Sequence, residues 1–295
     1  MRLRVGARTD TGRVRPQNED AFMSRAEEGL FVVCDGMGGA PAGEVASELA
    51  IQAIARRLTG DESGEGSTSS PFLPHTTRLL DAVRQSNEFI YGQAQKDPRQ
   101  AGMGTTVVSA WIREQIAGVA HVGDSRAYLW HNERLEPLTR DHSLMEAHIE
   151  AGLADEGKKL PVEQQNLLVR VLGREPAVEV DVTEVPVQSG DYVLLCSDGL
   201  TRMVSEEELA KAIQTFQEPQ QICDHLIATA NHNGGADNIT VVVVEVTGRW
   251  WHQLIKGVGS HLRRTLPTPL TRAGCRNLRC SMKVSSSRTT LLDQA

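Results

Sequence analysis

Residues 30–39 of the chain read Leu30-Phe31-Val32-Val33-Cys34-Asp35-Gly36-Met37-Gly38-Gly39. The apolar half of this stretch predicts a buried strand, which is expected to end on Asp35. A carboxylate at the mouth of a buried strand is costly unless a positive charge meets it. The glycines that follow permit a sharp turn and the close approach of a ligand. The stretch therefore predicts a site for a metal ion or a phosphate.

The same arrangement of an apolar strand and an aspartate recurs along the chain. Asp198 and Asp124 follow apolar runs, whereas Asp237 precedes one. In an antiparallel pair, the end of one strand and the start of its neighbour lie at the same edge. We therefore expect Asp35, Asp198 and Asp237 to converge at one rim of a sheet, with Asp124 nearby. A single Asp-Gly is more often a β-turn, but four aspartates at strand ends, each beside Gly or Asn, indicate a site.

Several carboxylates at one edge cannot all ionise unless cations are present. The ligands are hard oxygen atoms without His or Cys at matching positions, which favours Mg²⁺ or Mn²⁺ over Zn²⁺. Two such ions about 3.5–4 Å apart hold and deprotonate a bridging water, and such a site attacks phosphorus in line. Gly36 can add a backbone carbonyl ligand. The planar guanidinium of Arg15 can hold the phosphate through two hydrogen bonds.

The charge of the chain is unevenly distributed. The 295 residues carry a net charge of −7, yet from residue 247 onward there are nine Lys and Arg against one acid. The part before it has 22 Lys and Arg against 37 acids. An acidic body is a poor partner for nucleic acid, because phosphate backbones require positive surface. We expect a folded domain over 1–246 and a separate basic tail over 247–295.

The sequence was also compared with the patterns of targeting segments, membrane-spanning helices and disulfide frameworks. No apolar run follows the first four residues, no stretch reaches the roughly 18 apolar residues of a spanning helix, and the five cysteines form no disulfide-like framework. We therefore expect a cytoplasmic setting.

In the tail, apolar residues between Trp250 and Leu262 recur at helical spacing. They predict a short amphipathic helix that contacts an anionic membrane surface or a partner, and disorder is the alternative, favoured beyond Leu266.

The remaining elements are short strands and amphipathic helices. Periodicity predicts helices over 43–58, 77–95, 144–151, 205–215 and 219–230, with strands between them. Short strands separated by tight turns favour antiparallel pairing. Residues 155–165 are charged and irregular, which predicts a mobile flap. His121 and His142 lie near the site in sequence, but we expect them at the surface or behind the ligands.

Six motifs in the order of this chain resemble those of the metal-dependent type-2C (PPM) protein phosphatases, in their bacterial branch. The resemblance covers roughly 3–246. The motifs are Arg15-Pro16-Gln17-Asn18-Glu19-Asp20, Val33-Cys34-Asp35-Gly36-Met37-Gly38-Gly39, Gly102-Met103-Gly104-Thr105-Thr106, His121-Val122-Gly123-Asp124-Ser125-Arg126, Cys196-Ser197-Asp198-Gly199-Leu200 and Ala236-Asp237-Asn238-Ile239-Thr240. Jointly they are highly specific.

This resemblance implies an α+β fold, a four-layer α-β-β-α sandwich with two antiparallel sheets packed face to face. It implies hydrolysis of phosphoserine and phosphothreonine in proteins, without a covalent phosphoenzyme. In the family pattern, the position of Asp35 bridges two metal ions and Gly36 contributes its carbonyl. The positions of Asp198 and Asp237 complete the first metal. Asp124, with Asp198, binds a third and weaker ion.

Further residues and partners follow from the same resemblance. Glu19, Asp20 and Asn238 are expected to lie around the ligands rather than among them, and Arg15 matches the arginine that holds phosphate. Phosphorylated proteins, and a bacterial Ser/Thr kinase acting on them, are the expected partners of a monomer. Met37 departs from some members, which carry a histidine proposed as general acid there. In the flap over 155–172, Lys158-Lys159-Leu160-Pro161-Val162-Glu163 stands where the His-Pro and Arg of the family are expected.

Two alternatives remain open at this point. Cys196 and Arg202 fit the C-x₅-R pattern of cysteine phosphatases, in which a thiolate attacks phosphorus. Asp198 inside that loop would repel a phosphate, which weighs against this chemistry. The chain could also be a binding module that has lost catalysis, although every expected metal carboxylate is present.

Overall fold

The computed structural model describes residues 1–38, 42–59, 70–153 and 160–248, and in them the strands form two antiparallel sheets. Sheet I contains, in spatial order, β1 (Arg2–Asp10), β11 (Ile239–Thr247), β10 (Tyr192–Cys196), β7 (Arg126–His131) and β8 (Arg134–Pro137). Sheet II contains β2 (Asp20–Arg25), β3 (Leu30–Met37), β5 (Val107–Arg113), β6 (Ile116–Val122) and β9 (Asp181–Pro186), while β4 (Gly104–Thr105) pairs with the end of β3. The antiparallel pairing expected from the short strands is confirmed.

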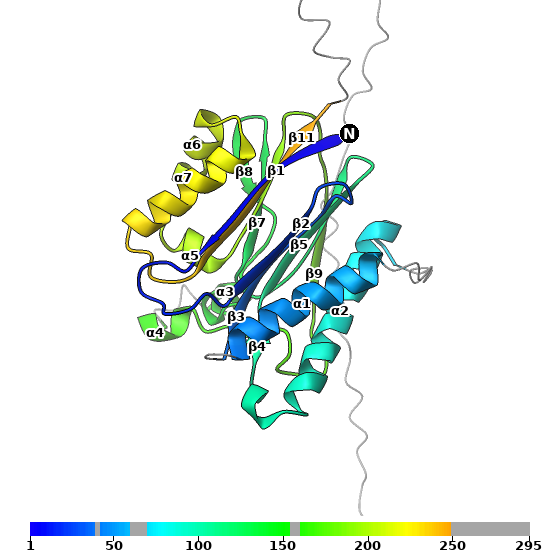
Figure 1. Cartoon of the computed structure of the whole chain (residues 1–295), viewed down its shortest axis with the longest axis vertical. Coiled ribbons are helices and arrows are strands. Elements are labelled where there is room, and N and C mark those ends of the chain that lie inside the picture. The colour runs from blue at the N-terminus through cyan, green and yellow to red at the C-terminus, as the bar shows by residue number, and fades with distance from the viewer. Residues whose placement is uncertain (39–41, 60–69, 154–159, 249–295) are drawn as a thin grey trace, which may run out of the picture.

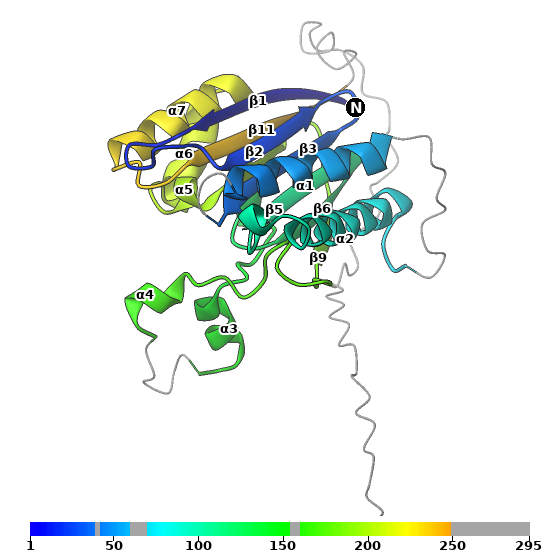
Figure 2. The same cartoon turned by 60° about the horizontal axis from the view of Figure 1, so that its bottom comes forward.

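Helices cover the outer face of each sheet (Figures 1 and 2). Helices α1 (Ala42–Thr59) and α2 (Pro74–Ala94) pack on sheet II, and α7 (Pro219–His232) packs on sheet I with α6 (Glu206–Thr215) beside it. The four-layer α-β-β-α sandwich is therefore confirmed. The short elements are η1 (Pro98–Gln100), α3 (Leu144–Glu150), α4 (Val162–Gln165) and α5 (Asp198–Thr201). Helices α3 and α4 project away from the sandwich in Figure 2.

The core consists of three apolar layers. Along β3, Phe31 and Val33 point between the sheets, whereas Val32 and Cys34 point toward α1 and α2. Because both faces of such a strand are buried, its sequence is apolar throughout rather than alternating. Cys196 lies in the opposite outer layer, under α6 and α7. Cys34 and Cys196 therefore lie in different outer layers of the core.

Strand β3 does not end at Asp35, contrary to the sequence-based expectation. It continues to Met37, because Gly36 and Met37 pair with β4. The turn begins only at Gly38, whose φ is +133°. A Cβ at Gly36 would lie 2.1 Å from the carbonyl oxygen of Gly43. Glycine is thus required at 36 for the close approach of α1 to β3, not for a turn.

The other boundaries differ only in detail. A capping box of Ser205 and Glu208 opens α6, close to the predicted start of the helix at 205. Strand β11 reaches Thr247, which pairs with Arg2, so the folded part extends slightly beyond the expected boundary at 246. Helix α4 lies in the segment expected to be irregular, while 154–159 and the tail from 249 lie outside the described residues.

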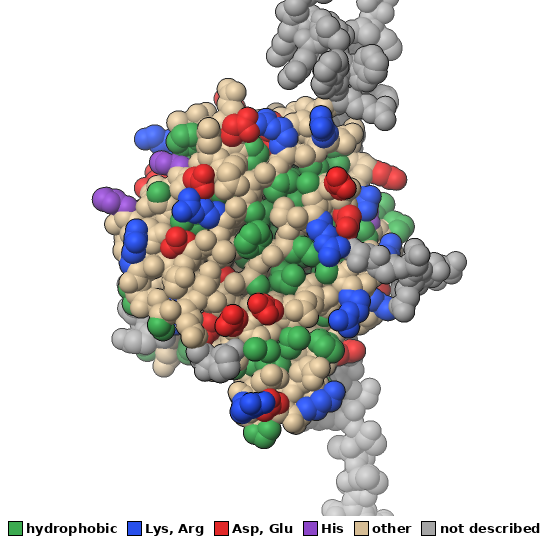
Figure 3. All heavy atoms as spheres, viewed as in Figure 1, with side chains coloured by type: hydrophobic (Ala, Val, Ile, Leu, Met, Phe, Trp, Pro, Cys, Tyr) green, Lys and Arg blue, Asp and Glu red, His purple; other side chains and the backbone are tan. Residues whose placement is uncertain are grey.

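Two surface observations bear on partners. On the face seen in Figure 3, acidic and basic side chains of the described residues are interspersed. Within the described part of the chain, no helix combines the length and apolarity that crossing a bilayer requires.

Candidate metal centre

Five aspartates converge where the ends of the two sheets meet. Asp35 on β3 and Asp124 after β6 come from sheet II, and Asp198 after β10 and Asp237 before β11 come from sheet I. Asp20, the first residue of β2, pairs directly with Asp35. The expected rim of a single sheet is therefore wrong, since the packing of two sheets brings these side chains together. The charges of Asp20, Asp124, Asp198 and Asp237 all act on Asp35, which is consistent with this convergence.

Burial and mutual repulsion make these carboxyl groups hard to ionise. Burial, followed by the charges of the other four aspartates, raises the pKa of Asp35 well above its usual range. Burial raises the pKa of Asp20 to about 7, although hydrogen bonds from Thr240 and Ser197 act in the opposite direction. The pKa of Asp124 also rises to about 7, through burial and the charge of Asp198. The positive charge near the cluster therefore does not balance its carboxylates.

Two arginines face the cluster. Arg15 donates from Nη2 to Asp237 Oδ2 over 2.8 Å. Arg202 forms a close ion pair with Asp198, and its Nη2 lies 3.8 Å from Asp124 Oδ2. Its Nη1 lies 3.7 Å from Asp237 Oδ2. Sequence reasoning missed Arg202 as part of this site, although its spacing of four residues from Asp198 on one helical turn was a usable signal.

The cluster also contains buried acceptors that no described group satisfies. Oδ1 of Asp198 and Oδ1 of Asp20 are buried, and within the described residues neither has a hydrogen-bond partner. Buried oxygen atoms without partners are rare, because their desolvation is not compensated. The potential metal-ligand atoms in this cluster are all hard carboxylate oxygens. A divalent ion such as Mn²⁺ or Mg²⁺ fits this set, since it would supply both the missing charge and the missing partners.

Asn238 holds the loop that precedes β2. Its Nδ2 donates to the carbonyl oxygens of Thr11 and Gln17, each over 2.9 Å, and its Oδ1 accepts from the backbone N–H of Glu19. A Cβ at Gly199 would lie 2.0 Å from the Asn238 carbonyl oxygen. Asn238 thereby fixes the segment that carries Arg15 and Glu19 against the end of sheet I.

The backbone of Asp35 is held by the Gly-Thr-Thr motif. Its N–H donates to Thr106 Oγ1 over 3.0 Å, and its carbonyl oxygen accepts from Thr105 Oγ1 over 2.9 Å. Thr106 Oγ1 in turn lies 2.7 Å from Ser125 Oγ, one residue beyond Asp124. These contacts give the motif a role that its sequence alone did not reveal, which is to fix Asp35 relative to the Asp124 turn.

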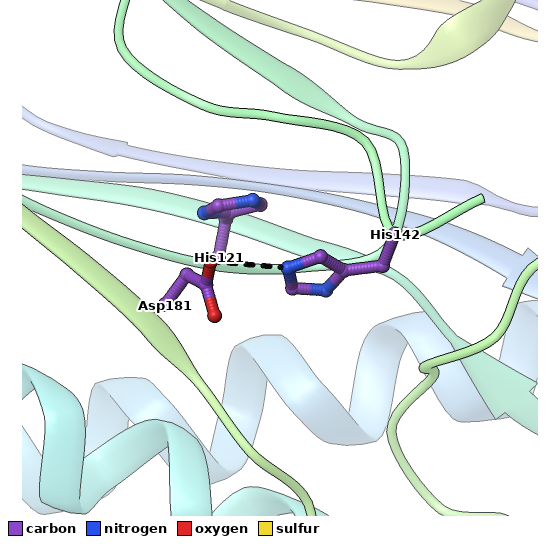
Figure 4. Close-up of side chains that lie close together, drawn as sticks. All are labelled: His121, His142 and Asp181. Atoms are coloured by element: carbon purple, nitrogen blue, oxygen red, sulfur yellow. Dashed lines mark ion pairs between the residues drawn. The ribbon is translucent and has the colours of Figure 1, made fainter. Parts of the chain in front are cut away.

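A second polar cluster, shown in Figure 4, contains His121, His142 and Asp181. One potential ligand atom from each residue lies within 4.8 Å of the others. His142 Nδ1 accepts from the Gly123 N–H over 3.2 Å. The Nε2 atom of the same ring faces Asp181 Oδ2 over 3.5 Å. Nδ1 is therefore occupied, and the Arg170 guanidinium, which lies 3.2 Å from Nε2, would repel a metal ion there.

The rest of this histidine cluster is already paired. Arg170 Nη1 lies 2.8 Å from Asp181 Oδ1 and 3.2 Å from His142 Nε2. His121 Nε2 contacts the carbonyl oxygen of Arg140 over 2.8 Å, and its ring stacks on that of His142. Both histidines are buried, which excludes the surface alternative and fits the other expectation, a position behind the ligands. We interpret this cluster as a structural clasp that ties both ends of the α3–α4 segment to sheet II.

The environment of Cys196 contradicts cysteine chemistry. Its side chain is fully buried in the layer under α6 and α7. Burial raises the pKa of its thiol to about 12, so no thiolate is available near neutral pH. Arg202, the other end of the C-x₅-R pattern, pairs with Asp198 instead.

A family model described as Protein phosphatase 2C matches residues 13–233. The chain belongs to this family. It is 39% identical over 241 residues to the serine/threonine phosphatase stp of Listeria innocua, a match that spans 81% of this chain and 94% of that protein. It is 38% identical over 281 residues to the serine/threonine protein phosphatase PstP of Mycobacterium tuberculosis, which spans 92% of this chain and 51% of PstP.

Solved structures agree with this assignment. A crystal structure of Mycobacterium tuberculosis PstP superposes with a TM-score of 0.73 at 36% identity, covering 84% of this chain and all of that one (100%). The PstP catalytic domain in complex with two manganese ions gives a TM-score of 0.71 at 36% identity, covering 84% of this chain and 99% of that one. The chain is thus a metal-dependent protein serine/threonine phosphatase of the 2C type.

Proposed function

We propose that this phosphatase hydrolyses phosphoserine and phosphothreonine by in-line attack of water on phosphorus, without a covalent phosphoenzyme. The observation that carries the proposal is the convergence of five aspartates with only two arginines among the described residues facing them. Such a site attracts divalent cations, and a buried thiol with a pKa near 12 offers no competing nucleophile.

We assign the ion ligands from the family pattern, and the convergence of the aspartates supports this assignment. Asp35 would be shared by two ions and Gly36 would add its carbonyl oxygen. Asp198 and Asp237 would complete the first position, while Asp124 with Asp198 would form a weaker third position. When bound, a pair of divalent ions lowers the pKa of a water toward neutrality and offsets negative charge on the phosphoryl group.

The protein itself supplies the orientation of the phosphate. The Arg15 side chain is 53% exposed, so its guanidinium can turn from Asp237 to an incoming phosphate at little cost. Two parallel N–H bonds from a guanidinium would fix the phosphoryl oxygens and leave the ester oxygen opposite the attacking water. Asn238 and Glu19 would position Arg15 through the loop that they hold. Met37 has no transferable proton, so the leaving serine oxygen must take its proton elsewhere.

We also propose the setting in which this activity operates. The relatives named serine/threonine phosphatases in Listeria and Mycobacterium support phosphoproteins as substrates, with a bacterial Ser/Thr kinase modifying the same targets. We further propose a cytoplasmic monomer with a catalytic domain over about 1–246. The basic tail from 247 would act separately, on an anionic membrane surface or a partner.

Hydrolysis of a phosphothreonine peptide with and without Mn²⁺ tests this function. We expect turnover with Mn²⁺ or Mg²⁺, loss of turnover with a chelator, and a single turnover that releases phosphate without an acid-stable phosphoprotein. The binding-module alternative predicts no turnover with either ion. Loss of activity in Cys196→Ser, with Mn²⁺ binding intact, would favour the cysteine mechanism instead.

A further inference from the structure

Arg202 occupies an unusual place in the cluster, because it faces three of its carboxylates from one side. It follows the single turn of α5, and its spacing from Asp198 directs the guanidinium back over that residue. From there Nη2 also approaches Asp124 at 3.8 Å, and Nη1 approaches Asp237 at 3.7 Å. The guanidinium therefore lies against Asp124 and Asp198, the pair proposed to hold the weaker ion, and also against Asp237, which with Asp198 would complete the first position.

No other charged group competes for this guanidinium among the described residues. Each ion pair found for the Arg202 side chain in those ranges is with an aspartate of the cluster. The side chain is 40% exposed, so it can move into solvent without leaving a buried charge. Its partners differ in this respect, since the side chains of Asp124 and Asp198 are 9% and 11% exposed. The arginine can leave, but the carboxylates remain.

We infer that Arg202 is a built-in counter-cation that competes with a divalent ion for Asp124 and Asp198 and thereby weakens the binding of that ion. This inference rests on the proposed metal centre. The reason is electrostatic, because a guanidinium and a divalent cation cannot both lie against the same two carboxylates without strong repulsion. In the metal-free protein Arg202 limits repulsion between the aspartates. When an ion binds, the arginine must move away, and that displacement opposes binding.

Arg202 should lower the affinity of the different ion positions to different extents. Arg202 also pairs with Asp237, so the first ion, which Asp35, Asp198 and Asp237 would hold, is affected as well, but Asp35 is not among the described ion-pair partners of Arg202, whereas both Asp124 and Asp198 are. Displacement of Arg202 should therefore weaken the ion at Asp124 and Asp198 more than the core pair. Arg202 acts here as a residue that sets metal affinity, not as a group that contacts the reacting phosphorus.

Calorimetric titration of the full chain with Mn²⁺ tests this directly. We expect Arg202→Gln to tighten the weakest Mn²⁺ site about tenfold, because the competing charge is lost while the side-chain size is nearly kept. Arg202→Lys should fall between that variant and the wild type, since Lys keeps the charge without the guanidinium fork. Arg8→Gln is the matched control, because Arg8 is similarly exposed (44%) and pairs with Asp224 outside the cluster. It should leave all Mn²⁺ affinities unchanged.

Thermal unfolding of the metal-free variants supplies a second readout that does not depend on activity. Arg202→Gln should lower the melting temperature without metal and increase the rise in melting temperature on adding Mn²⁺. Unchanged or weaker Mn²⁺ binding in both Arg202 variants would overturn the inference. A raised KM for phosphopeptide with unchanged Mn²⁺ affinity would also overturn it, since Arg202 would then bind substrate. Absence of Mn²⁺ binding in the wild type would instead contradict the proposed metal centre.

Discussion

The aspartate cluster around Asp35 and the histidine clasp around His142 are neighbours, because His142 bonds to the residue before Asp124. Both contain residue types that bind metals. In the clasp, His142, Asp181 and Arg170 satisfy one another. In the aspartate cluster, buried oxygens of Asp20 and Asp198 lack partners within the described chain. The difference teaches that unmet charge and unmet hydrogen bonds, not ligand type, distinguish a metal centre from a structural cluster.

The largest effect is expected from removing a carboxylate that would hold more than one ion, because such a residue distinguishes the aspartate cluster from the histidine clasp most clearly. Asp198→Asn should reduce Mn²⁺-dependent hydrolysis of p-nitrophenyl phosphate by about 10³-fold or more, since the charge stabilisation supplied by bound ions amounts to several kcal/mol. Asp124→Asn should reduce it less, through the weaker ion only. Steady-state rates at saturating Mn²⁺ measure both. Wild-type rates in Asp198→Asn would refute the site assignment.

Removal of a clasp residue should affect stability rather than metal binding. His142→Ala leaves the Gly123 N–H without its acceptor and creates a cavity beside His121, so we expect a loss of about 3 kcal/mol in the free energy of unfolding. The number of Mn²⁺ ions bound at saturation should stay the same. Denaturant unfolding and calorimetry on one preparation provide the two values. Loss of a bound ion together with unchanged stability would make the clasp a metal site.

The pH dependence of the metal-free protein should sharpen the same contrast. The pKa values of Asp20 and Asp124 are raised from about 4 in an unfolded chain to about 7, so the folded state binds more protons between these values. Protonation of these two groups adds to the free energy of unfolding in full below about pH 4, and this contribution is lost as the pH rises through 7. We expect a lower melting temperature at pH 8 than at pH 5.5 without metal, and Mn²⁺ should reverse the order. A rising metal-free melting temperature over this range would contradict the account.

The smallest effect is expected at the tail. A chain ending at Gly248 keeps the pairing of Thr247 with Arg2 and the bond from the Gly248 N–H to Ser189 Oγ. It should therefore retain the kcat and melting temperature of the full chain within error. An inactive or unfolded product would place the domain boundary farther along the chain.

Sequence reasoning reached the ligand candidates because each aspartate comes directly after or shortly before an apolar run, a local pattern. It could not show that Asp35 and Asp198 come from different sheets, since only long-range packing brings those strand ends together. It also placed a turn after Asp35, where pairing of Gly36 with β4 overrides the local signal. The histidine clasp escaped notice for a related reason, because its members are separated in sequence and only the fold unites them.

Diffraction from crystals soaked in Mn²⁺, recorded for anomalous scattering, tests the central claim most directly. The account predicts anomalous peaks among Asp35, Asp198 and Asp237, a weaker one at Asp124, and none among His121, His142 and Asp181. A peak at the histidine clasp, or empty density among the aspartates at saturating Mn²⁺, would contradict it.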